Sequence, residues 1–438
     1  WNSSAGATNY RLQVSTTSSF ITTTVDELAL TATSRQIGPL AYGTTFYWRA
    51  SASNIGGSSS YSPTASFTTI PAPATTLTVN TSVSFPAKQK RQDYATSDYK
   101  LFGLPGGVIA VNSVLGGTPG TDWQIYWDNG SSSNYQVAYD GSSTFQFGNG
   151  RAFWLLSNSS ISVSRSLNGP SQNQTYEVEI PLHAGWNMIT NPFTTAIPWS
   201  RVQAANGTTG TIQTYSGSWT IASSFDPYAG YYFFNSSPQL SVLKVPYYSL
   251  YGDVGEPPGK AFDGWKVSVV LNSDGATSGE TFFGVSAGAD QALDEFDIRR
   301  PRALAAINDV YFERPEWDYD YPTFGSDIRA VMQQTEEWNF KVSAEPNRPS
   351  TLTFTGMQEI PAQYEVFLLD KSSGKSVSLR RNSSYAFVSP LRTMEFTVVV
   401  GTKEAVLKKA SELLPTEFSI SQNFPNPFNP TTNVRVTV

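Results

Sequence analysis

The 438-residue sequence contains no cysteine and a single histidine, His183. Without cysteine the chain can form neither a disulfide, nor a thiolate nucleophile, nor a cysteine-ligated zinc site. One histidine cannot build a histidine-rich zinc site, and no G-x-S-x-G nucleophile elbow accompanies it. We therefore expect a protein without enzymatic activity, in which His183 lies in a strand and has a structural role.

Charge and long apolar runs are also scarce. Only 15% of the residues are charged, the formal net charge is -6 at pH 7, and the sequence pI is about 5.0. A nucleic-acid partner would need a basic stripe to displace counterions, so the acidic charge argues against one and we expect none. No run of about 18 apolar residues occurs, so we expect no membrane-spanning helix.

Aromatic residues, by contrast, make up 13% of the chain, and Gly, Ser, Thr and Asn are abundant. This composition favours β-sandwiches, because aromatic and β-branched side chains pack well on pleated, half-buried surfaces. A single hydrophobic core usually stops growing at about 250 residues. We predict an all-β protein with several β-sandwich domains in tandem.

Residues 1–71 contain short strands separated by polar turns. Apolar residues alternate with polar ones in "NYRLQV" and in "TFYWRASAS", so each strand has one buried face. The spacing of Leu40, Thr44, Phe46 and Trp48, followed by "ASNIGGSSSYSP" and "ASFTT", resembles a fibronectin type III domain of bacterial extracellular proteins. The resemblance implies a sandwich that lacks the first strand of the family and has an open sheet edge.

Residues 77–247 form a second region that is rich in aromatic residues and glycine. Two stretches in it repeat at a separation of 80, with Gly150 and Trp154 matching Gly230 and Phe234, which predicts an internal duplication. The stretches "LFGLPGG", "DWQIYWDNG" and "AGYYFF" resemble a β-domain common in large bacterial surface proteins. Aromatic rings of this kind can also bind sugars when they are exposed, although sandwiches bury most of them.

Residues 248–402 contain further regularly spaced strand patterns, among them "GWKVSVVLN", "WNFKVSAEP" and "MEFTVVVG". We predict another β-sandwich domain here. The stretch "GADQALDEFDIRRP" resembles the domain that often precedes a type IX secretion sorting domain. In residues 403–417 the apolar side chains recur at helical spacing, which predicts a short helical spacer.

The last region, residues 418–438, begins with "FSISQNFPNPFNP" and ends in an alternating strand pattern. Because proline fixes φ and lacks a donor, the first part cannot be a central strand. The stretch resembles the start of the type A sorting domain of cargo proteins of the type IX secretion system. Its matching residues are Phe424, Pro425, Asn426, Pro427, Phe428, Asn429 and Pro430. The resemblance implies export by that machinery to the exterior of a Gram-negative cell.

One acidic cluster offers candidate metal ligands. Asp290, Asp294 and Asp297 supply the hard oxygen atoms that Ca²⁺ prefers, although EF-hand spacing is missing. The alternative interpretation is a solvated turn that is paired with the arginines at 299, 300 and 302. No other cofactor is expected.

The modular β architecture and the sorting-type terminus predict a non-enzymatic, extracellular structural protein on the cell surface or in a filament. The terminal strand of one copy could complete the open N-terminal sandwich of the next, which would assemble copies head to tail by β-strand complementation. The residues of this polymerisation strand are Thr432, Asn433, Val434, Arg435, Val436, Thr437 and Val438. Two alternatives stay open: an adhesin or carbohydrate-binding module that recognises surface glycans, and the non-catalytic C-terminal part of a larger secreted hydrolase.

Overall fold

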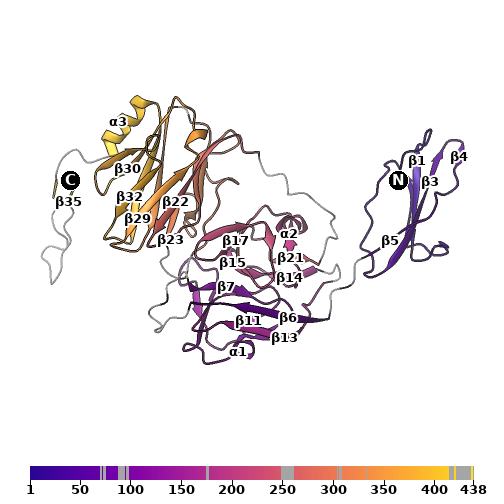
Figure 1. Ribbon diagram of the computed structural model, residues 1–438. Helices are drawn as coiled ribbons and strands as arrows, with labels where there is room; N and C mark the ends of the chain where they lie inside the picture. Colours follow the sequence, from indigo (N-terminus) through magenta and orange to yellow (C-terminus); the bar gives the residue numbers. More distant parts are fainter. Residues whose placement is uncertain are drawn as a thin grey trace.

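The computed structural model describes residues 1–69, 72, 75–86, 94, 98–173, 177–247, 261–302, 304, 308–332, 334–413, 419–420 and 436–437. Within them the chain is mostly β-strand, and its α-helices are α1 (Val111–Val114), α2 (Trp199–Asn206) and α3 (Lys403–Leu413). The predicted all-β class with tandem β-domains is confirmed (Figure 1). Among the described residues, no helix has both the length and the apolar character needed to cross a bilayer.

The N-terminal module, residues 1–69, is one antiparallel sheet. Its strands are β1 (Asn9–Ser15), β2 (Val25–Leu30), β3 (Thr45–Asn54), β4 (Gly57–Ser58) and β5 (Ala65–Thr68). The order is β2-β1-β3-β4, and β5 also pairs with β3.

Alternation gives this sheet one apolar and one polar face. Leu12, Val14 and Phe46 are buried on the apolar face, and side chains that include Trp1 and Leu40 pack against them. The sequence predicted a sandwich that lacks one strand, but these 69 residues contain no second sheet. The N-terminal Trp1 and the loop residues Ile37 and Leu40, rather than a facing sheet, add to the apolar cover.

The central module, residues 76–246, consists of two halves with the same order of elements. The first half contains β6 (Thr76–Val83), β7 (Lys100–Gly103), β8 (Ile109–Ala110), α1, β9 (Trp123–Asp128), β10 (Gln136–Ala138), β11 (Gln146–Phe147), β12 (Ala152–Ser157) and β13 (Ile161–Asn168). The second half contains β14 (Glu177–Pro181), β15 (Gly185–Thr190), β16 (Ile197–Pro198), α2, β17 (Ile212–Tyr215), β18 (Trp219–Ala222), β19 (Ser224–Phe225), β20 (Gly230–Asn235) and β21 (Val242–Pro246).

The strands of the two halves also pair in the same way. The sheet β10-β9-β12-β7 corresponds to β18-β17-β20-β15, while β6–β13 and β8–β11 correspond to β14–β21 and β16–β19. Bridges between the halves are reciprocal, because Phe102 pairs with Ala229 and Arg151 pairs with Ile189. Such reciprocity is expected of two halves related by an approximate two-fold axis.

The register of the repeat differs from the one that the sequence indicates. Ala152 begins β12 opposite Gly103, and Gly230 begins β20 opposite Thr190, so Gly230 is equivalent to Ala152 and not to Gly150. The reason is packing: Trp154 and Tyr232 face each other in a core shared by the halves, and the Trp154 Nε1 donates a hydrogen bond of 3.0 Å to the Tyr232 Oη.

The third module, residues 264–401, is a two-sheet sandwich. Its elements are β22 (Gly264–Ser273), β23 (Ala276–Thr277), β24 (Thr281–Ser286), β25 (Asp309–Glu313), β26 (Thr323–Phe324), β27 (Ser326–Arg329), β28 (Thr335–Ser343), β29 (Pro349–Thr355), the 3₁₀-helix η3 (Met357–Glu359), β30 (Glu365–Asp370), β31 (Lys375–Ser378), β32 (Ser384–Val388) and β33 (Thr393–Gly401). One sheet has the order β27-β24-β22-β29-β32, with β23 beside β22, and the other has the order β26-β25-β28-β33-β30-β31. Inward-facing residues of both sheets, among them Trp265, Trp338 and Phe396, form a single core.

The predicted C-terminal helix is present as α3. Its Val406 and Ala410 are buried against Leu369 and Val399 of the sandwich, so the helix is an attached part of the third module. Beyond it, β34 (Ser419–Ile420) pairs antiparallel with β35 (Val436–Thr437). The terminal strand was expected to be alone in the chain, but these two residues satisfy backbone groups of β34 instead. Residues 424–430 of the sorting motif, and residues 432–435 and 438 of the polymerisation strand, lie outside the described residues.

Candidate ligand-binding cleft between two modules

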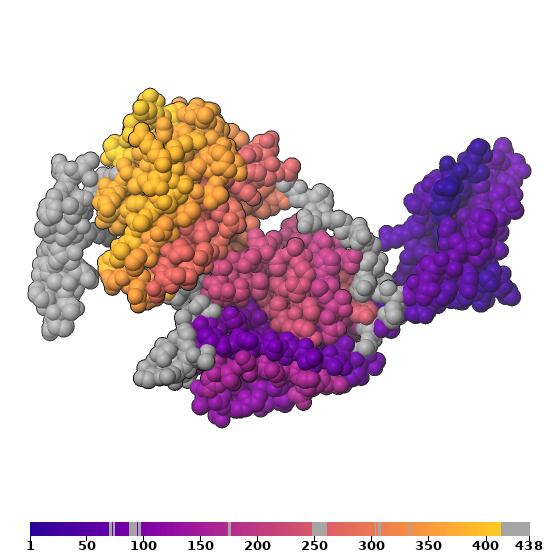
Figure 2. Space-filling view, in the orientation of Figure 1, coloured from indigo at the N-terminus to yellow at the C-terminus, as the bar shows by residue number. Residues whose placement is uncertain are grey.

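The central and third modules lie directly against each other (Figure 2). The contact centres on the segment that follows residue 298. Gln213 of the central module donates a hydrogen bond of 2.6 Å from Nε2 to the Arg299 carbonyl oxygen. The guanidinium of Arg299 lies 4.2 Å from the ring centroid of Phe234. We call this contact region the joint.

A buried ion pair anchors the joint. Arg302 of the third module reaches into the central module, where it lies 3.8 Å from the ring centroid of Tyr135 and donates a hydrogen bond of 2.8 Å to the Ser132 carbonyl oxygen. Its Nη2 is 3.7 Å from Oδ1 of Asp128, whose side chain is only 1% exposed. Burial raises the pKa of Asp128, whereas Arg302 and the hydrogen bonds from Gly130 and Tyr232 oppose that rise.

A tyrosine completes the joint. The Tyr321 hydroxyl donates a hydrogen bond to the Gly130 carbonyl oxygen, and its ring packs edge-on against Phe234 at a centroid distance of 5.1 Å. Gly185, with φ of +81°, lies directly beneath this hydroxyl. Among the described residues, Arg302 Nε and Nη2 are buried without a hydrogen-bond partner, so the joint is held by the ion pair with Asp128, the Ser132 and Gly130 carbonyl oxygens and the ring contacts.

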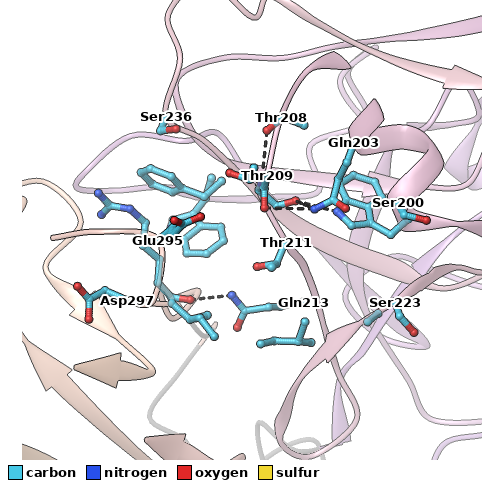
Figure 3. Close-up of a pocket in the computed structure, with 18 of the residues that line it drawn as sticks. Ser200, Gln203, Thr208, Thr209, Thr211, Gln213, Ser223, Ser236, Glu295 and Asp297 are labelled. Carbon is cyan, nitrogen blue, oxygen red and sulfur yellow. Dashed lines mark hydrogen bonds between the residues drawn. The ribbon is translucent and has the colours of Figure 1, made fainter. Parts of the chain in front are cut away.

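Beside the joint is a cleft of about 620 Å³ (Figure 3). One wall comes from the central module, namely α2, the loop after it and β18. The other wall comes from the third-module segment 293–299. The cleft has the size of a typical small-ligand site, which spans roughly 300–1,000 Å³.

The local sequence explains the shape of the central-module wall. Helix α2 ends at Gly207, which adopts the left-handed conformation with φ of +60°. The returning loop is held by its own helix, because Gln203 Nε2 donates to the carbonyl oxygens of Thr209 and Gly210 at 3.2 and 3.1 Å. Trp199 Nε1 adds a hydrogen bond of 2.7 Å to the Gly210 carbonyl oxygen. Thr208 Oγ1 also accepts a hydrogen bond of 3.1 Å from the Gly210 N–H, so among the threonine hydroxyls of this loop only those of Thr209 and Thr211 take no part in holding it.

Those hydroxyl groups surround the cleft. Within the described part of the chain, the side-chain hydroxyls of five lining residues make no hydrogen bond to protein, and all five residues are exposed or half-buried. They are Ser200, Thr209, Thr211, Ser223 and Ser236. Each hydroxyl can both donate and accept a hydrogen bond. This wall of the cleft therefore offers a ligand uncharged donors and acceptors side by side.

The third-module wall is acidic. Asp297 is 7% exposed and accepts hydrogen bonds from the backbone N–H of Ile328 at 2.9 Å and of Asp294 at 3.1 Å. Burial raises its pKa to about 7. Asp294 in turn accepts from the N–H groups of Asp290 and Phe296 at 2.6 and 2.8 Å.

The structure thus brings the three candidate calcium ligands into one loop. Asp294 and Asp297 use their carboxylates as acceptors for backbone N–H groups, and Asp290 meets Asp294 through its own N–H. In the described ranges, no group of three or more His, Cys, Asp or Glu side chains gathers in a metal-binding arrangement. Calcium binding stays a prediction. The nearby Arg299, Arg300 and Arg302 form ion pairs with Asp318, Asp309 and Asp128.

A smaller chamber of about 340 Å³ extends the cleft along the joint. It shares Gln213, Ile221 and Ile298 with the larger cavity and reaches Trp219 and Arg300. Arg300 is buried and donates from Nη2 to the Glu280 carbonyl oxygen and to Thr281 Oγ1, both at 2.8 Å. Its charge is therefore engaged within the third module.

His183 lies apart from the residues that line the cleft. It is not in a strand, as the sequence predicted, but in the connection between β14 and β15. Its Nδ1 is 3.0 Å from the Ala184 carbonyl oxygen, and its ring packs on Gly130 so closely that a Cβ there would be 2.1 Å away. These contacts are consistent with the structural role that we expected for His183.

Sequence reasoning did not identify the cleft. Its hydroxyl residues come from a turn-rich stretch, "NGTTGT", that indicates a helix end but not a site. No protein-family model matches the chain, and a search of the curated proteins finds no relative. The fold and the cleft together define a tandem all-β protein with a fixed joint between two of its modules.

Proposed function

We propose that the chain is a non-enzymatic structural protein of the exterior of a Gram-negative bacterium, exported by the type IX secretion machinery. In this role the central and third modules act as one stiff unit. The resemblance of residues 418–430 to a sorting domain supports the location, and the modular β architecture supports the structural role.

The joint is the observation that carries the proposal. Its charged residues, Arg302 and Asp128, are paired with each other and are shielded by rings, and Tyr321 bridges the two modules. A structural protein needs such fixed joints, because modules joined only by linkers move independently. Catalysis would instead require a reactive group that is accessible to substrate.

Assembly into filaments by head-to-tail strand complementation is part of this proposal. Residues 432–438 of one copy would pair with an exposed sheet edge of another copy. The pairing of Val436 and Thr437 with β34 competes with this exchange, but a ladder of two residues contributes few hydrogen bonds.

Negative-stain electron microscopy of the purified chain tests the proposal, with size-exclusion chromatography for the mass. We expect fibres of regular repeat, and we expect a variant that lacks residues 431–438 to elute as a monomer. Fibres that persist in the shortened variant would rule out the strand-exchange mechanism, and a monodisperse monomer of the complete chain would remove the filament role.

A further inference from the structure

We infer that the cleft beside the joint binds a neutral oligosaccharide. This inference goes beyond the structural role, because it assigns a ligand class to a particular surface of the molecule. It begins from the five hydroxyl groups of the central-module wall that make no hydrogen bond to protein within the described residues. Two lining amides, those of Gln203 and Gln213, bind the protein through their nitrogen atoms, and no hydrogen bond from the described residues reaches their Oε1 atoms.

The lining selects for a ligand that is rich in hydroxyl groups. Sites for apolar ligands are lined mainly by hydrophobic side chains with a few polar groups. Here eight of the fourteen central-module residues that line the cleft carry a hydroxyl or an amide group, and an apolar ligand would leave those groups without partners. A sugar offers hydroxyls that both donate and accept, so it can satisfy the wall group by group.

Charge excludes an anionic sugar. The third-module wall carries Asp294 and Glu295, which would repel a carboxylate, sulfate or phosphate. The lining cation Arg299 is engaged, because its Nη1 is 2.9 Å from Asp318 Oδ2 and donates to the Tyr321 carbonyl oxygen. A neutral ligand avoids both the repulsion and the cost of breaking this ion pair.

Apolar contact is available for the C–H face of a sugar ring. Ile221 is 46% exposed at the point where the two chambers meet. Phe234 also lines the larger chamber, but the Arg299 guanidinium covers its ring at 4.2 Å from the centroid, so Ile221 is the main apolar contact. The two chambers are neighbours that share Gln213, Ile221 and Ile298, and together they suit a chain of rings better than a monosaccharide.

A peptide fits the cleft less well. Extended peptides bind by adding a strand to an open sheet edge or by filling an apolar groove. Strand β18 is the edge of its sheet, but the third module covers its start, since a Cβ on Gly279 would be 2.4 Å from the Trp219 carbonyl oxygen. The remaining edge is too short for a stable ladder.

The test is a titration of the complete chain with neutral oligosaccharides. The probes are oligomers of glucose, mannose, galactose, xylose and N-acetylglucosamine, with oligogalacturonate and a basic and an apolar peptide as comparisons. Calorimetry and tryptophan fluorescence report binding, because Trp186 and Trp199 line the cleft. We expect saturable binding of at least one neutral oligosaccharide and none of the oligogalacturonate.

Two variants and a matched control locate the site. Ser223→Trp places a ring in the cleft from an exposed position and should weaken binding by about tenfold or more. Thr209→Val with Thr211→Val removes two hydroxyls at nearly constant volume and should weaken it similarly. Ala204→Trp changes an exposed position of α2 that does not line the cleft, and it should leave binding unchanged.

Three results would overturn the inference: no neutral oligosaccharide binds, the peptides or oligogalacturonate bind instead, or binding survives Ser223→Trp and the double valine variant. Circular dichroism confirms that each variant is folded. We expect the substituted chains to form the same fibres in electron micrographs as the unaltered chain. Loss of glycan binding and loss of fibre formation are therefore separate observations, and each tests one proposal.

Discussion

Gly185 shows how a single residue allows two modules to approach each other at the joint. Its φ of +81° lies in the left-handed region, and an added Cβ would be 2.2 Å from the Tyr321 Oη. The position therefore requires glycine for two reasons, backbone conformation and the approach of another module. Gly275 has nearly the same φ, +77°, but no atom lies within 4 Å of its added Cβ.

We expect Gly185→Ala to reduce the free energy of unfolding by about 2–4 kcal/mol, the sum of backbone strain and overpacking. Gly275→Ala should cost only the strain, about 1–2 kcal/mol. Urea denaturation measures both. Adding Tyr321→Phe, which removes the hydroxyl, should recover part of the loss in the first variant. Equal losses in the two alanine variants would mean that the Tyr321 contact is unimportant.

Asp297 makes stability depend on pH. Burial raises its pKa from the ordinary 3.8 to about 7, so between these values the folded chain keeps a proton that the unfolded chain releases. The free energy of unfolding therefore falls as pH rises from about 4 to about 7, by up to about 4 kcal/mol from this group. Asp297→Asn should flatten this part of the profile, because it stays neutral. Urea denaturation at several pH values provides the measurement, and an unchanged slope in the variant would assign the effect to other groups.

At the scale of elements, the strands are of two kinds: some are buried on both faces and others on one face only. Every residue of β12 is buried, because Phe153 faces the core of the first half and Trp154 faces the core shared by the halves. In β13 only Val163 and Leu167 are buried, at the alternating positions of a half-exposed strand. The sequence already shows which strand is buried on both faces. The run "AFWLL" of β12 is continuously apolar, whereas in "ISVSRSL" of β13 apolar and polar residues alternate.

Helix α3 offers a direct test of attachment. Val406 is fully buried against the sandwich, whereas the adjacent Leu407 is 50% exposed. Val406→Ala should lower the free energy of unfolding by about 1–2 kcal/mol through lost burial. Leu407→Ala removes a larger side chain and should cost less than about 0.5 kcal/mol. Thermal denaturation compares them, and similar losses would mean that the helix is not docked as described.

At the scale of the whole molecule, the joint makes the central and third modules one body. Arg302→Ala would leave Asp128 buried without its cation, so we expect a loss of up to about 3–5 kcal/mol. Arg348→Ala breaks a pair with Asp274 in which both side chains are more than half exposed, and it should cost at most about 1 kcal/mol.

Denaturation gives the energies for this pair of variants, and small-angle X-ray scattering reports the shape. We expect a larger radius of gyration for Arg302→Ala, because the two modules would separate, and no change for Arg348→Ala. A scattering profile of Arg302→Ala that matches the unaltered chain would show that other contacts hold the joint.

Much of the fold could be predicted from local patterns. The alternation in "NYRLQV" indicated β1, and the helical spacing of Val406, Leu407 and Ala410 indicated α3. The repeat in the central module was visible, although its register shifted by two residues. That shift could not be predicted, because it depends on Trp154 and Tyr232 meeting across a core.

The candidate site could not be predicted in the same way. The acidic loop with Asp294 and Asp297 drew attention as a calcium candidate, but nothing in the sequence indicates that it faces the hydroxyls of Thr209 and Thr211. Serine and threonine in turns are common, and only their unpaired state at a cavity makes them informative.

The sequence by itself determined the all-β class, the positions of several strands such as β1, β3, β22, β28 and β33, the C-terminal helix and the exclusion of thiol chemistry. These properties follow from periodicity and from residue types, which act over a few neighbouring positions. Only the tertiary structure decided the joint and the cleft. Tyr321 and Gly130 are 191 residues apart along the chain, so their hydrogen bond depends on how whole modules pack, a property that no local pattern encodes.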